Sequence, residues 1–413
     1  MLRIARNGNL RGSKPMFRIS QLLKTFHDDL PANKAHKMPG PVVIWNLIRR
    51  CNLRCKHCYS TSLDMDFKDE LNTEQIKATI DDLKVAHVPV LILSGGEPLM
   101  RPDIFEITAY AKSKGFYVAL STNGTLIDES NIEQIKAADY QYVGISIDGL
   151  EEFHDEFRQQ KGSFKQSMHA LKLCKAAGIK VGMRLCLTHD NFADLPAMLD
   201  LMEEYKVDKF YLSHLNYSGR GKRNAENDAV FKMTKDAMEM LYERAWSHIS
   251  QGIDTDFVTG NNDADGPFLL QWVEKRFGDK YPERIANLKQ RLINWGGNAS
   301  GINVANIDNT GTIHPDTYWW NHPIGNVKTE KFSDVWRDTQ DPLMLGFRQS
   351  PRPVKGRCAK CQYLNICGGN TRTRAFAQSK DAWAEDPGCY LTDAEIGVQT
   401  QHSKTTEIPC VEV

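Results

Sequence analysis

Cys51-Asn-Leu-Arg-Cys55-Lys-His-Cys58-Tyr59 is the stretch that decides the fold, because it places three thiols within eight residues, just after the apolar run 41–48. An iron–sulfur cube held by three thiolates keeps one iron without a protein ligand, and that iron can bind and activate a small molecule. Four thiolates would close the cluster. The spacing therefore indicates a reactive cluster rather than a structural one.

A zinc site is the alternative interpretation of this run. Cys and His at short spacings also suit tetrahedral zinc, and His57 would then be the fourth ligand. His57 stands between two of the cysteines, however, whereas a zinc knuckle more often combines a Cys-x-x-Cys pair with a distant second pair. The iron–sulfur interpretation is the favoured one.

The composition is that of an ordinary globular protein. The chain has 413 residues, 41% of them hydrophobic and 25% charged, which is enough for two or three domains with full cores. Lys plus Arg and Asp plus Glu both total 52, so no overall field favours nucleic acid or an anionic membrane. No apolar run approaches the roughly 18 residues of a membrane helix. We therefore expect neither a nucleic-acid nor a membrane partner.

Residues 1–40 are expected to form a leader and a short helix. The first 15 residues are basic and polar and lack the apolar stretch of a secretory signal, with Met16 as an alternative start to Met1. Apolar residues recur at helical spacing from Ile19 to Phe26. Ten cysteines, seven of them in ligand-like spacings, point to the reducing cytoplasm rather than to disulfides.

From residue 41 to 225, β-branched runs alternate with amphipathic helical patterns, as in repeated βα units around a parallel sheet. We expect strands at 42–48, 90–94, 116–121, 142–147, 180–187 and 209–214, and helices at 73–85, 104–114, 131–138, 163–177 and 192–205. Six strands are too few to close a TIM barrel. The predicted fold class is therefore α/β, a partial (β/α)6 TIM-like barrel. Thr73 is expected to cap its helix, and Gly115 and Gly178 to end theirs.

Residues 226–300 are expected to be a helical linker region that completes the core. Helical patterns run from 231 to 249 and from 272 to 293, and a Gly-, Asn- and Asp-rich loop lies at 260–266.

Polar, glycine-bearing motifs end three of the predicted strands, where ligands bind in parallel βα architectures. These motifs are Ser94-Gly-Gly-Glu-Pro98, Ser121-Thr-Asn-Gly124 and Ser146-Ile-Asp-Gly149. Glycine permits close approach of the backbone to a ligand. Taken singly, each motif is also ordinary turn chemistry.

A second group of cysteines, Cys358, Cys361, Cys367 and Cys389, lies in a loop-rich region. Four thiolates close a site, so this one should be structural or electron-transferring. By ligand count alone, zinc fits it nearly as well as a cluster.

Together these features resemble the radical S-adenosylmethionine (SAM) superfamily. There the open iron chelates the methionine part of SAM, and an electron from the cluster cleaves the sulfonium to give a 5′-deoxyadenosyl radical. The resemblance implies a [4Fe–4S] cluster on Cys51, Cys55 and Cys58. It assigns nine residues to SAM: His57, Gly95, Gly96, Glu97, Ser121, Asn123, Ser146, Asp148 and Arg158.

Within this set the Gly-Gly-Glu motif would bind the SAM amino group, and Arg158 with Ser146 would hold the ribose and carboxylate. His57 occupies the slot, usually aromatic in the family, that packs on the adenine. A solvated charge is the alternative interpretation of Arg158.

The second cysteine group resembles the outer auxiliary cluster of the SPASM extension, with two, five and twenty-one intervening residues. Asp316 and Thr371 stand where cysteines of the inner cluster would be expected. The resemblance therefore implies a shortened, Twitch-like domain over 301–413 with one auxiliary [4Fe–4S] cluster. His314, Asp316 and His322 near the vacated position are candidates for acid/base groups or for an axial ligand to a substrate metal. Buried, hydrogen-bonded side chains are the alternative.

Further motifs look like the tetrapyrrole-modifying branch of the superfamily: Tyr217-Ser-Gly-Arg-Gly221, Gly297-Asn-Ala-Ser-Gly301, His314-Pro-Asp316 and Gly369-Asn-Thr-Arg-Thr-Arg374. The strongest resemblance is to the radical SAM enzymes of heme d1 biosynthesis. It implies removal of two propionate side chains from 12,18-didecarboxysiroheme, with flavodoxin or ferredoxin as reductant. Arg220, Lys222 and Arg223 are candidates for gripping substrate carboxylates, and a solvated basic loop explains them equally well.

Three alternatives stay open. One is a sister heme-synthesis decarboxylase of the siroheme or coproheme route. Another is a peptide-modifying radical SAM maturase, although residues 1–40 look too short for its usual leader-recognition domain. The third is a zinc-stabilised binding protein, which metal analysis would separate from a protein with two iron–sulfur cubes.

Overall fold

The computed structural model describes residues 16–32, 39–229 and 231–399. An eleven-stranded sheet forms its centre, in the order β1-β8-β7-β6-β5-β4-β3-β2-β9-β10-β11. The strands are β1 Phe17–Arg18, β2 Val42–Asn46, β3 Val90–Ser94, β4 Tyr117–Thr122, β5 Tyr142–Ser146, β6 Val181–Leu187, β7 Lys209–His214, β8 Asp256–Gly260, β9 Val304–Ile307, β10 Thr312–His314 and β11 Gly325–Asn326.

The helices of the first part of the chain are α1 Ile19–His27, α2 Thr73–Val85, α3 Ile104–Ser113, α4 Ile132–Ala137, α5 Glu151–Arg158, α6 Ser163–Ala176, α7 Leu195–Glu204 and α8 Phe231–Ser250. They are followed by α9 Asp265–Phe277, α10 Pro282–Trp295, α11 Phe332–Asp338, α12 Pro342–Arg348, α13 Gly356–Lys360, α14 Leu364–Cys367 and α15 Arg372–Ser379. Short 3-10 turns lie at η1 Pro98–Met100, η2 Phe192–Asp194 and η3 Gly219–Asn227.

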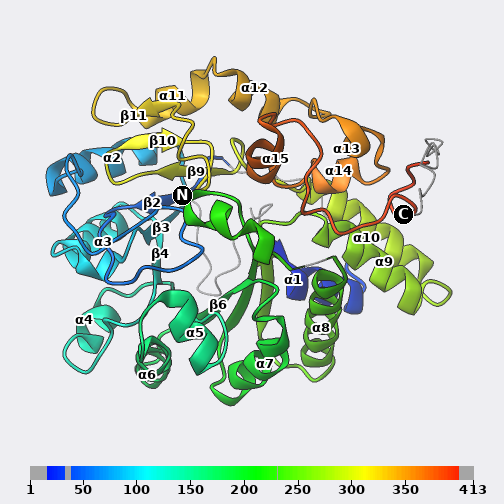
Figure 1. The fold of residues 1–413 in the computed structure, drawn as a ribbon, viewed down its shortest axis with the longest axis horizontal. Coiled ribbons are helices and arrows are strands. Elements are labelled where there is room, and N and C mark those ends of the chain that lie inside the picture. The colour runs from blue at the N-terminus through cyan, green and yellow to red at the C-terminus, as the bar shows by residue number, and fades with distance from the viewer. Residues whose placement is uncertain (1–15, 33–38, 230, 400–413) are drawn as a thin grey trace, which may run out of the picture.

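The six predicted strands are confirmed as β2 to β7, which lie side by side in chain order and are all parallel. Figure 1 shows the helices that connect them on the outer side of the curved sheet. Strands covered on both faces need nearly continuous apolar runs, and Val90–Ser94 is such a run. Because the strands are parallel, all their carboxyl ends meet at one rim, where the predicted motifs lie.

The sheet extends past the six predicted strands. β8 adds parallel to β7, and β9, from the region after residue 300, adds parallel to β2. The region 226–300 is therefore not purely helical, and the predicted loop at 260–266 is wrong at both ends, since Gly260 ends β8 and α9 begins at Asp265. A five-residue strand between polar turns has too little periodicity to be recognised.

The sheet remains open, as the partial-barrel prediction requires. β1 pairs antiparallel with β8 at one edge, and β10 and β11 continue antiparallel from β9 at the other. Within the described ranges no strand joins β1 to β11. The auxiliary region is thus built onto the edge of the same sheet that carries the three-cysteine loop.

The cap of α2 differs from the prediction. Asn72, not Thr73, is the N-cap, because its side chain accepts from the Gln75 amide while the Gln75 side chain accepts from the Asn72 amide. Thr73 instead donates its hydroxyl to Asp103. Gly115 and Gly178 do follow helix ends in left-handed conformations, as expected.

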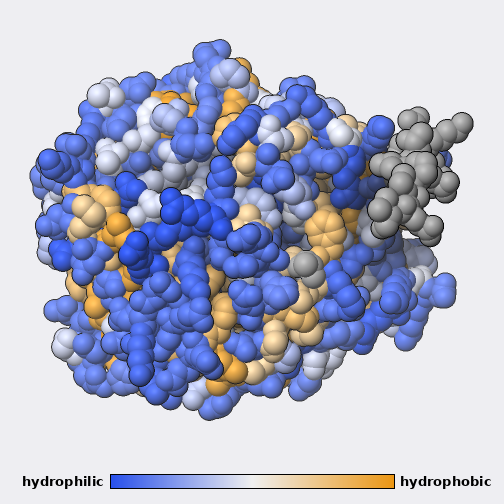
Figure 2. Space-filling view, viewed as in Figure 1, coloured by the Kyte–Doolittle hydropathy of each residue, from blue (hydrophilic) through white to orange (hydrophobic). Residues whose placement is uncertain are grey.

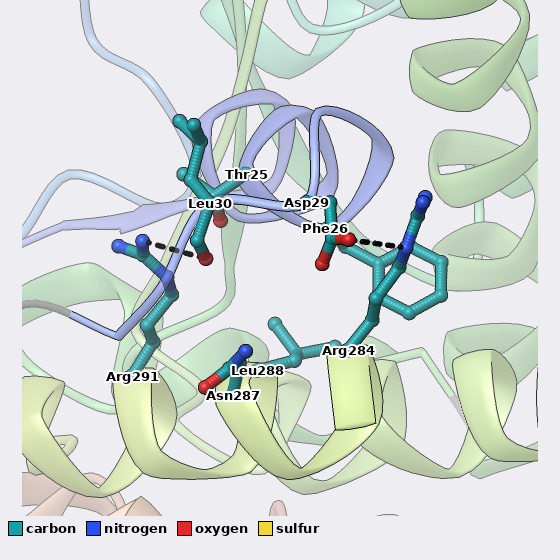
Figure 3. A pocket seen from close by; sticks show the side chains of 8 residues that line it. All are labelled: Thr25, Phe26, Asp29, Leu30, Arg284, Asn287, Leu288 and Arg291. Atoms are coloured by element: carbon teal, nitrogen blue, oxygen red, sulfur yellow. Dashed lines mark hydrogen bonds and ion pairs between the residues drawn. The ribbon is translucent and has the colours of Figure 1, made fainter. Parts of the chain in front are cut away.

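The predicted N-terminal helix is confirmed as α1, whereas the predicted leader, 1–15, lies outside the described residues. Just after α1, Asp29 lies 3.4 Å from the Arg284 guanidinium, and the Leu30 carbonyl accepts a 3.2 Å hydrogen bond from Arg291 (Figure 3). Phe26 packs against Phe277 with ring centroids 5.3 Å apart. These contacts fasten the N-terminal segment to α9 and α10.

The surface is mainly hydrophilic on the face that Figure 2 shows, with apolar residues scattered in small groups. In the described part of the chain, the helices are too short or too polar to cross a membrane.

Candidate functional site

The three-cysteine loop follows β2 and runs back along the barrel rim. The Cys51 amide donates to the Leu63 carbonyl, and the Cys51 sulfur accepts from the Leu53 amide at 3.4 Å. Burial raises the pKa of the Cys51 thiol, and the charges of Glu97, Cys55 and Cys58 raise it further. Neighbouring buried thiolates need a compensating cation, so the donor set fits an iron cluster held by three cysteines.

The Gly95–Gly96 turn holds this loop in place. A Cβ added to Gly96 would lie 2.2 Å from the Arg50 carbonyl oxygen, and one added to Gly95 would lie 2.4 Å from that of Ile48. The Gly96 amide donates to the Ile48 carbonyl at 2.6 Å. The close backbone approach predicted for these glycines therefore includes the strand end that leads into the cluster loop.

Glu97 ties the ends of two strands together. Its carboxylate accepts from the Thr122 hydroxyl at 2.7 Å and from the amides of Asn123 and Leu99 at 2.8 and 3.1 Å. Burial raises the pKa of Glu97 to about 7, against the lowering effect of these donors. Asn123 in turn donates to Asn52 at 3.0 Å, inside the cluster loop.

Asp148 and Arg158 form a buried ion pair beside the cluster loop. One Asp148 oxygen lies 2.7 Å from Arg158 Nε and 2.5 Å from its Nη2, and the other accepts from the Cys186 amide at 2.8 Å. Arg158 also donates toward the Cys55 sulfur at 3.5 Å. The solvated-charge alternative for Arg158 is wrong. Asp148 orients a guanidinium next to a predicted iron ligand.

Replacing Asp148 with Asn should weaken SAM binding about tenfold or more, because a charged hydrogen-bonded partner of Arg158 is removed and an amide NH2 takes its place. Equilibrium dialysis of anaerobically reconstituted protein measures the SAM dissociation constant. Asp190→Asn, at an exposed Asp paired only with His189, is the control. An unchanged SAM affinity in the Asp148 variant, at unchanged iron content, would refute this positioning role.

Two further predicted SAM residues are engaged by other side chains. His57 stacks on Phe157 with centroids 4.5 Å apart and planes 4° apart, and burial lowers the pKa of His57 to about 4, so its ring is neutral near pH 7. The Ser121 hydroxyl accepts a hydrogen bond from Arg184. Ser146 ends β5 and keeps accessible surface. Contact of these residues with SAM stays a prediction.

The Arg220 guanidinium is partly engaged by the cluster loop. It donates to the carbonyl of Cys55 at 2.7 Å and to that of Ser62 at 3.0 Å, so it braces this loop, and its contact with a substrate carboxylate stays a prediction. Lys222 and Arg223 are exposed on the turn η3, as the solvated-loop alternative has it. A sequence pattern cannot tell which partners, 158 and 165 residues away, an arginine will take.

The three acid/base candidates are all hydrogen-bonded. His314 is buried between the His322 carbonyl and Asp308, each at 3.3 Å. Asp316 accepts from Ser300 and from the Tyr318 amide, and burial raises its pKa. His322 lies 2.9 Å from Asp341. Their geometry is that of structural partners, and a catalytic role for any of them stays a prediction.

The second cysteine group comes together from three segments of the auxiliary region. Burial raises the pKa of Cys367, and the charges of Asp263, Cys389, Cys358 and Cys361 raise it further. The Cys361 amide donates to the Cys358 carbonyl, and Arg357, next to Cys358, donates to the Cys389 carbonyl at 3.5 Å, so hydrogen bonds bring these segments together. Nowhere in the described ranges do three Cys, His, Asp or Glu side chains surround a single metal-ion position. A cube makes a different demand, because each thiolate binds its own iron. The four-thiol donor set fits such a cluster.

Buried arginines lie around this second site, two of them in the motif Gly369–Arg374 and the third, Arg352, outside any quoted motif. Arg352 donates to the Gly368 carbonyl at 3.0 Å, and Arg372 to the Gly369 carbonyl, both in the turn after Cys367. Arg374 pairs with Asp386 through two 2.9 Å contacts and reaches the Leu215 and Asn261 carbonyls of the barrel. The motif Gly369–Arg374 was a sequence signal for Arg372 and Arg374, whereas Arg352 carried none.

The two cysteine sites lie along one continuous line of contacts. Tyr59, next to Cys58, packs against Tyr318 with centroids 5.4 Å apart, and Asn261 donates to the Tyr318 hydroxyl at 2.7 Å. Asn261 also accepts from Arg374, whose partner Asp386 receives the Gly388 amide beside Cys389. This line of contacts therefore joins the segments that carry the two cysteine groups.

Known proteins are similar to this chain in sequence and in fold. A family model described as "Radical SAM superfamily" matches residues 45–202. Pre-heme d1 synthase of Dinoroseobacter shibae is 46% identical over 96% of this chain and 97% of its own length. Fe-coproporphyrin III synthase of Methanosarcina barkeri is 41% identical over 86% of this chain and 89% of its own length.

The solved structure of Streptococcus suis SuiB bound to S-adenosylmethionine covers 87% of this chain and 79% of its own, with a TM-score of 0.66 at 18% identity. At that identity the match supports the fold alone. The fold is thus shared with SuiB, and the sequence match extends over nearly the full length of a relative at 46% identity. The chain belongs to the radical SAM superfamily.

Proposed function

We propose that this enzyme acts in heme d1 biosynthesis and removes two propionate side chains of 12,18-didecarboxysiroheme on the way to the oxo groups of heme d1. The observation that carries the proposal is the 46% identity to pre-heme d1 synthase, which spans the cysteine loop, the barrel and the auxiliary region alike. With seven thiols committed to clusters and an external flavodoxin or ferredoxin as reductant, the proposal places the reaction in a reducing cytoplasm.

Two [4Fe–4S] clusters and SAM would supply the radical and an acceptor for an electron when bound. Cys51, Cys55 and Cys58 would hold the first cluster. The protein's own contribution is positioning: Asp148 orients Arg158 beside Cys55, and Arg220 fixes the carbonyl of Cys55.

The auxiliary region contributes the second half of the site. Cys358, Cys361, Cys367 and Cys389 would hold the second cluster, and the line of contacts through Tyr318 and Asn261 keeps their segments against the barrel mouth. A substrate bound at that mouth would border both clusters. That placement supports a reaction in which hydrogen abstraction is followed by removal of an electron.

Anaerobic reconstitution followed by incubation with SAM, a strong reductant and 12,18-didecarboxysiroheme tests the proposal. We expect 5′-deoxyadenosine together with a tetrapyrrole of lower mass, measured by chromatography and mass spectrometry. Formation of 5′-deoxyadenosine with no mass change in any candidate tetrapyrrole would sink the heme assignment while leaving the radical chemistry in place.

A second candidate is decarboxylation in a sister heme route. The 41% identity to Fe-coproporphyrin III synthase favours it specifically. The product identified in the same assay separates the two functions, because Fe-coproporphyrin III formed in step with SAM consumption is what the name of this relative implies.

A further inference from the structure

Arg184 is a lumen-facing arginine that none of the roles above uses. It lies in the middle of β6, beside Ser146, the last residue of β5, and Tyr211 of β7. A Cβ added to Gly144 would lie 2.9 Å from the Arg184 Cδ atom, so the side chain lies across this glycine. Glycine at that position leaves room for the guanidinium inside the barrel.

The guanidinium is held in place but its charge is not neutralised. Arg184 donates to the Ser121 hydroxyl and lies 5.1 Å over the Tyr211 ring. Among the ion pairs of the described residues, none involves Arg184. A largely buried cation with no anionic partner is costly, and an incoming carboxylate would relieve that cost.

The charges deeper in the barrel do not supply this partner. Asp256 lies 2.6 Å from Arg18 and 3.7 Å from Lys209, so this carboxylate is already shared by two cations. The pKa of Lys209 is lowered to about 8, chiefly by burial. The charge of Asp256 raises this pKa, whereas the charges of Arg18 and Arg184 lower it. This part of the lumen thus holds one acidic side chain, Asp256, and three basic ones: Arg18, Arg184 and Lys209.

Aromatic rings lie close to the end of β7, since Asn261 donates both to Ser213 of β7 and to the Tyr318 hydroxyl. Tyr59 meets Tyr318 and Trp320 edge-on, with centroids 5.4 and 6.2 Å away. Tyr211 and Tyr318 are enclosed strongly enough that burial raises the pKa of both, yet both keep solvent-accessible surface. Accessible aromatic faces inside a protein suit a flat, apolar ring system that carries polar groups at its edge.

We propose that Arg184, held by Ser121 and Tyr211, binds a carboxylate side chain of the tetrapyrrole, with the macrocycle lying against Tyr59, Tyr318 and Trp320. This inference rests on the proposed function. Arg184 contacts β4 and β7, not the cluster loop. Arg158, beside Cys55, is the cation on the SAM side of the site. An arginine fork matches a carboxylate better than any other side chain.

The test measures tetrapyrrole binding to reconstituted enzyme by the change in Soret absorbance. Arg184→Gln should weaken binding of the tetrapyrrole acid about tenfold or more. The affinity of Arg184→Lys should lie between those of the wild type and the Gln variant, since lysine keeps the charge but cannot form two parallel hydrogen bonds. Arg244→Gln, at a surface arginine paired with Asp200 and Glu203, is the matched control and should bind like the wild type.

A methyl ester of the tetrapyrrole tests the same contact without any mutation. Wild-type enzyme should bind the ester about as weakly as the Gln variant binds the acid, and the Gln variant should not distinguish acid from ester. Equal binding of acid and ester by the wild type would overturn this inference while leaving the proposed function standing.

Two other outcomes would also overturn it. No tetrapyrrole binding by the wild type would remove the proposed function and this inference together. SAM affinity is measured on the same preparations. If Arg184→Gln weakens binding of SAM but not of the tetrapyrrole, Arg184 contacts the SAM carboxylate instead.

Discussion

Replacing Cys55 with Ala will abolish SAM cleavage, whereas replacing Cys361 with Ala will spare cleavage and impair formation of the tetrapyrrole product. The two variants should differ in activity because each removes one thiolate from a different cluster site. The buried Cys55 sulfur lies 3.5 Å from Arg158. Without it the first cluster has two protein ligands, too few to hold a cube with one open iron.

Cys361 belongs to the four-thiol set and not to the three-cysteine loop that would hold the SAM-cleaving cluster. Its loss should remove the auxiliary cluster, so iron should fall by about half while 5′-deoxyadenosine still forms. Cys174→Ala is the matched control, because Cys174 is buried in α6 among apolar neighbours and should keep both activities. Liquid chromatography of 5′-deoxyadenosine and of the tetrapyrrole measures both effects. SAM cleavage by the Cys55 variant, or a full product yield from the Cys361 variant, would contradict the division of roles.

The six barrel strands could be predicted from sequence because each is an apolar run between turn residues. The bounds of β3 and β7 were predicted to the residue. β8 and β9 could not be recognised, since five and four residues carry little periodicity and their membership depends on neighbours distant in the chain. Parallel pairing of Val304 with Val42 is a tertiary event.

The site was predictable in its sulfur ligands and much less so in its charges. Cysteines that bind one cluster from one loop are close together in the sequence, so their spacing can be recognised without the structure. An arginine reveals its partner only in three dimensions. Arg220 was expected to contact the substrate, and in the structure it donates to backbone carbonyls. Arg184 belongs to none of the sequence motifs, yet it faces the barrel lumen, hydrogen-bonded to Ser121 and without an acidic partner among the described residues. The alternation of side chains along a strand could have identified Arg184, because Gly182, Arg184 and Cys186 fall on one face of β6.

Arg374→Ala should be the most destabilising single change outside the cluster cysteines, at about 3–5 kcal/mol of unfolding free energy. Arg374 and Asp386 expose 1% and 0% of their side chains. Truncating the arginine leaves a buried carboxylate without its cation, and it frees the Leu215 and Asn261 carbonyls that Arg374 also satisfies. Urea denaturation under anaerobic conditions measures the loss.

The matched control is Arg337→Ala on α11. Arg337 also pairs with two aspartates, but its side chain is 64% exposed, and surface ion pairs contribute at most about 1 kcal/mol. Because Asp386 also receives the amides of Thr371 and Gly388, the Arg374 variant should also loosen the Cys389 loop and lower auxiliary iron content. If both arginine variants shift stability equally, the buried pair is not what holds the auxiliary region to the barrel. A large loss confined to Arg374, accompanied by loss of iron, would mean that this ion pair couples the second cysteine site to the rim where the first one lies.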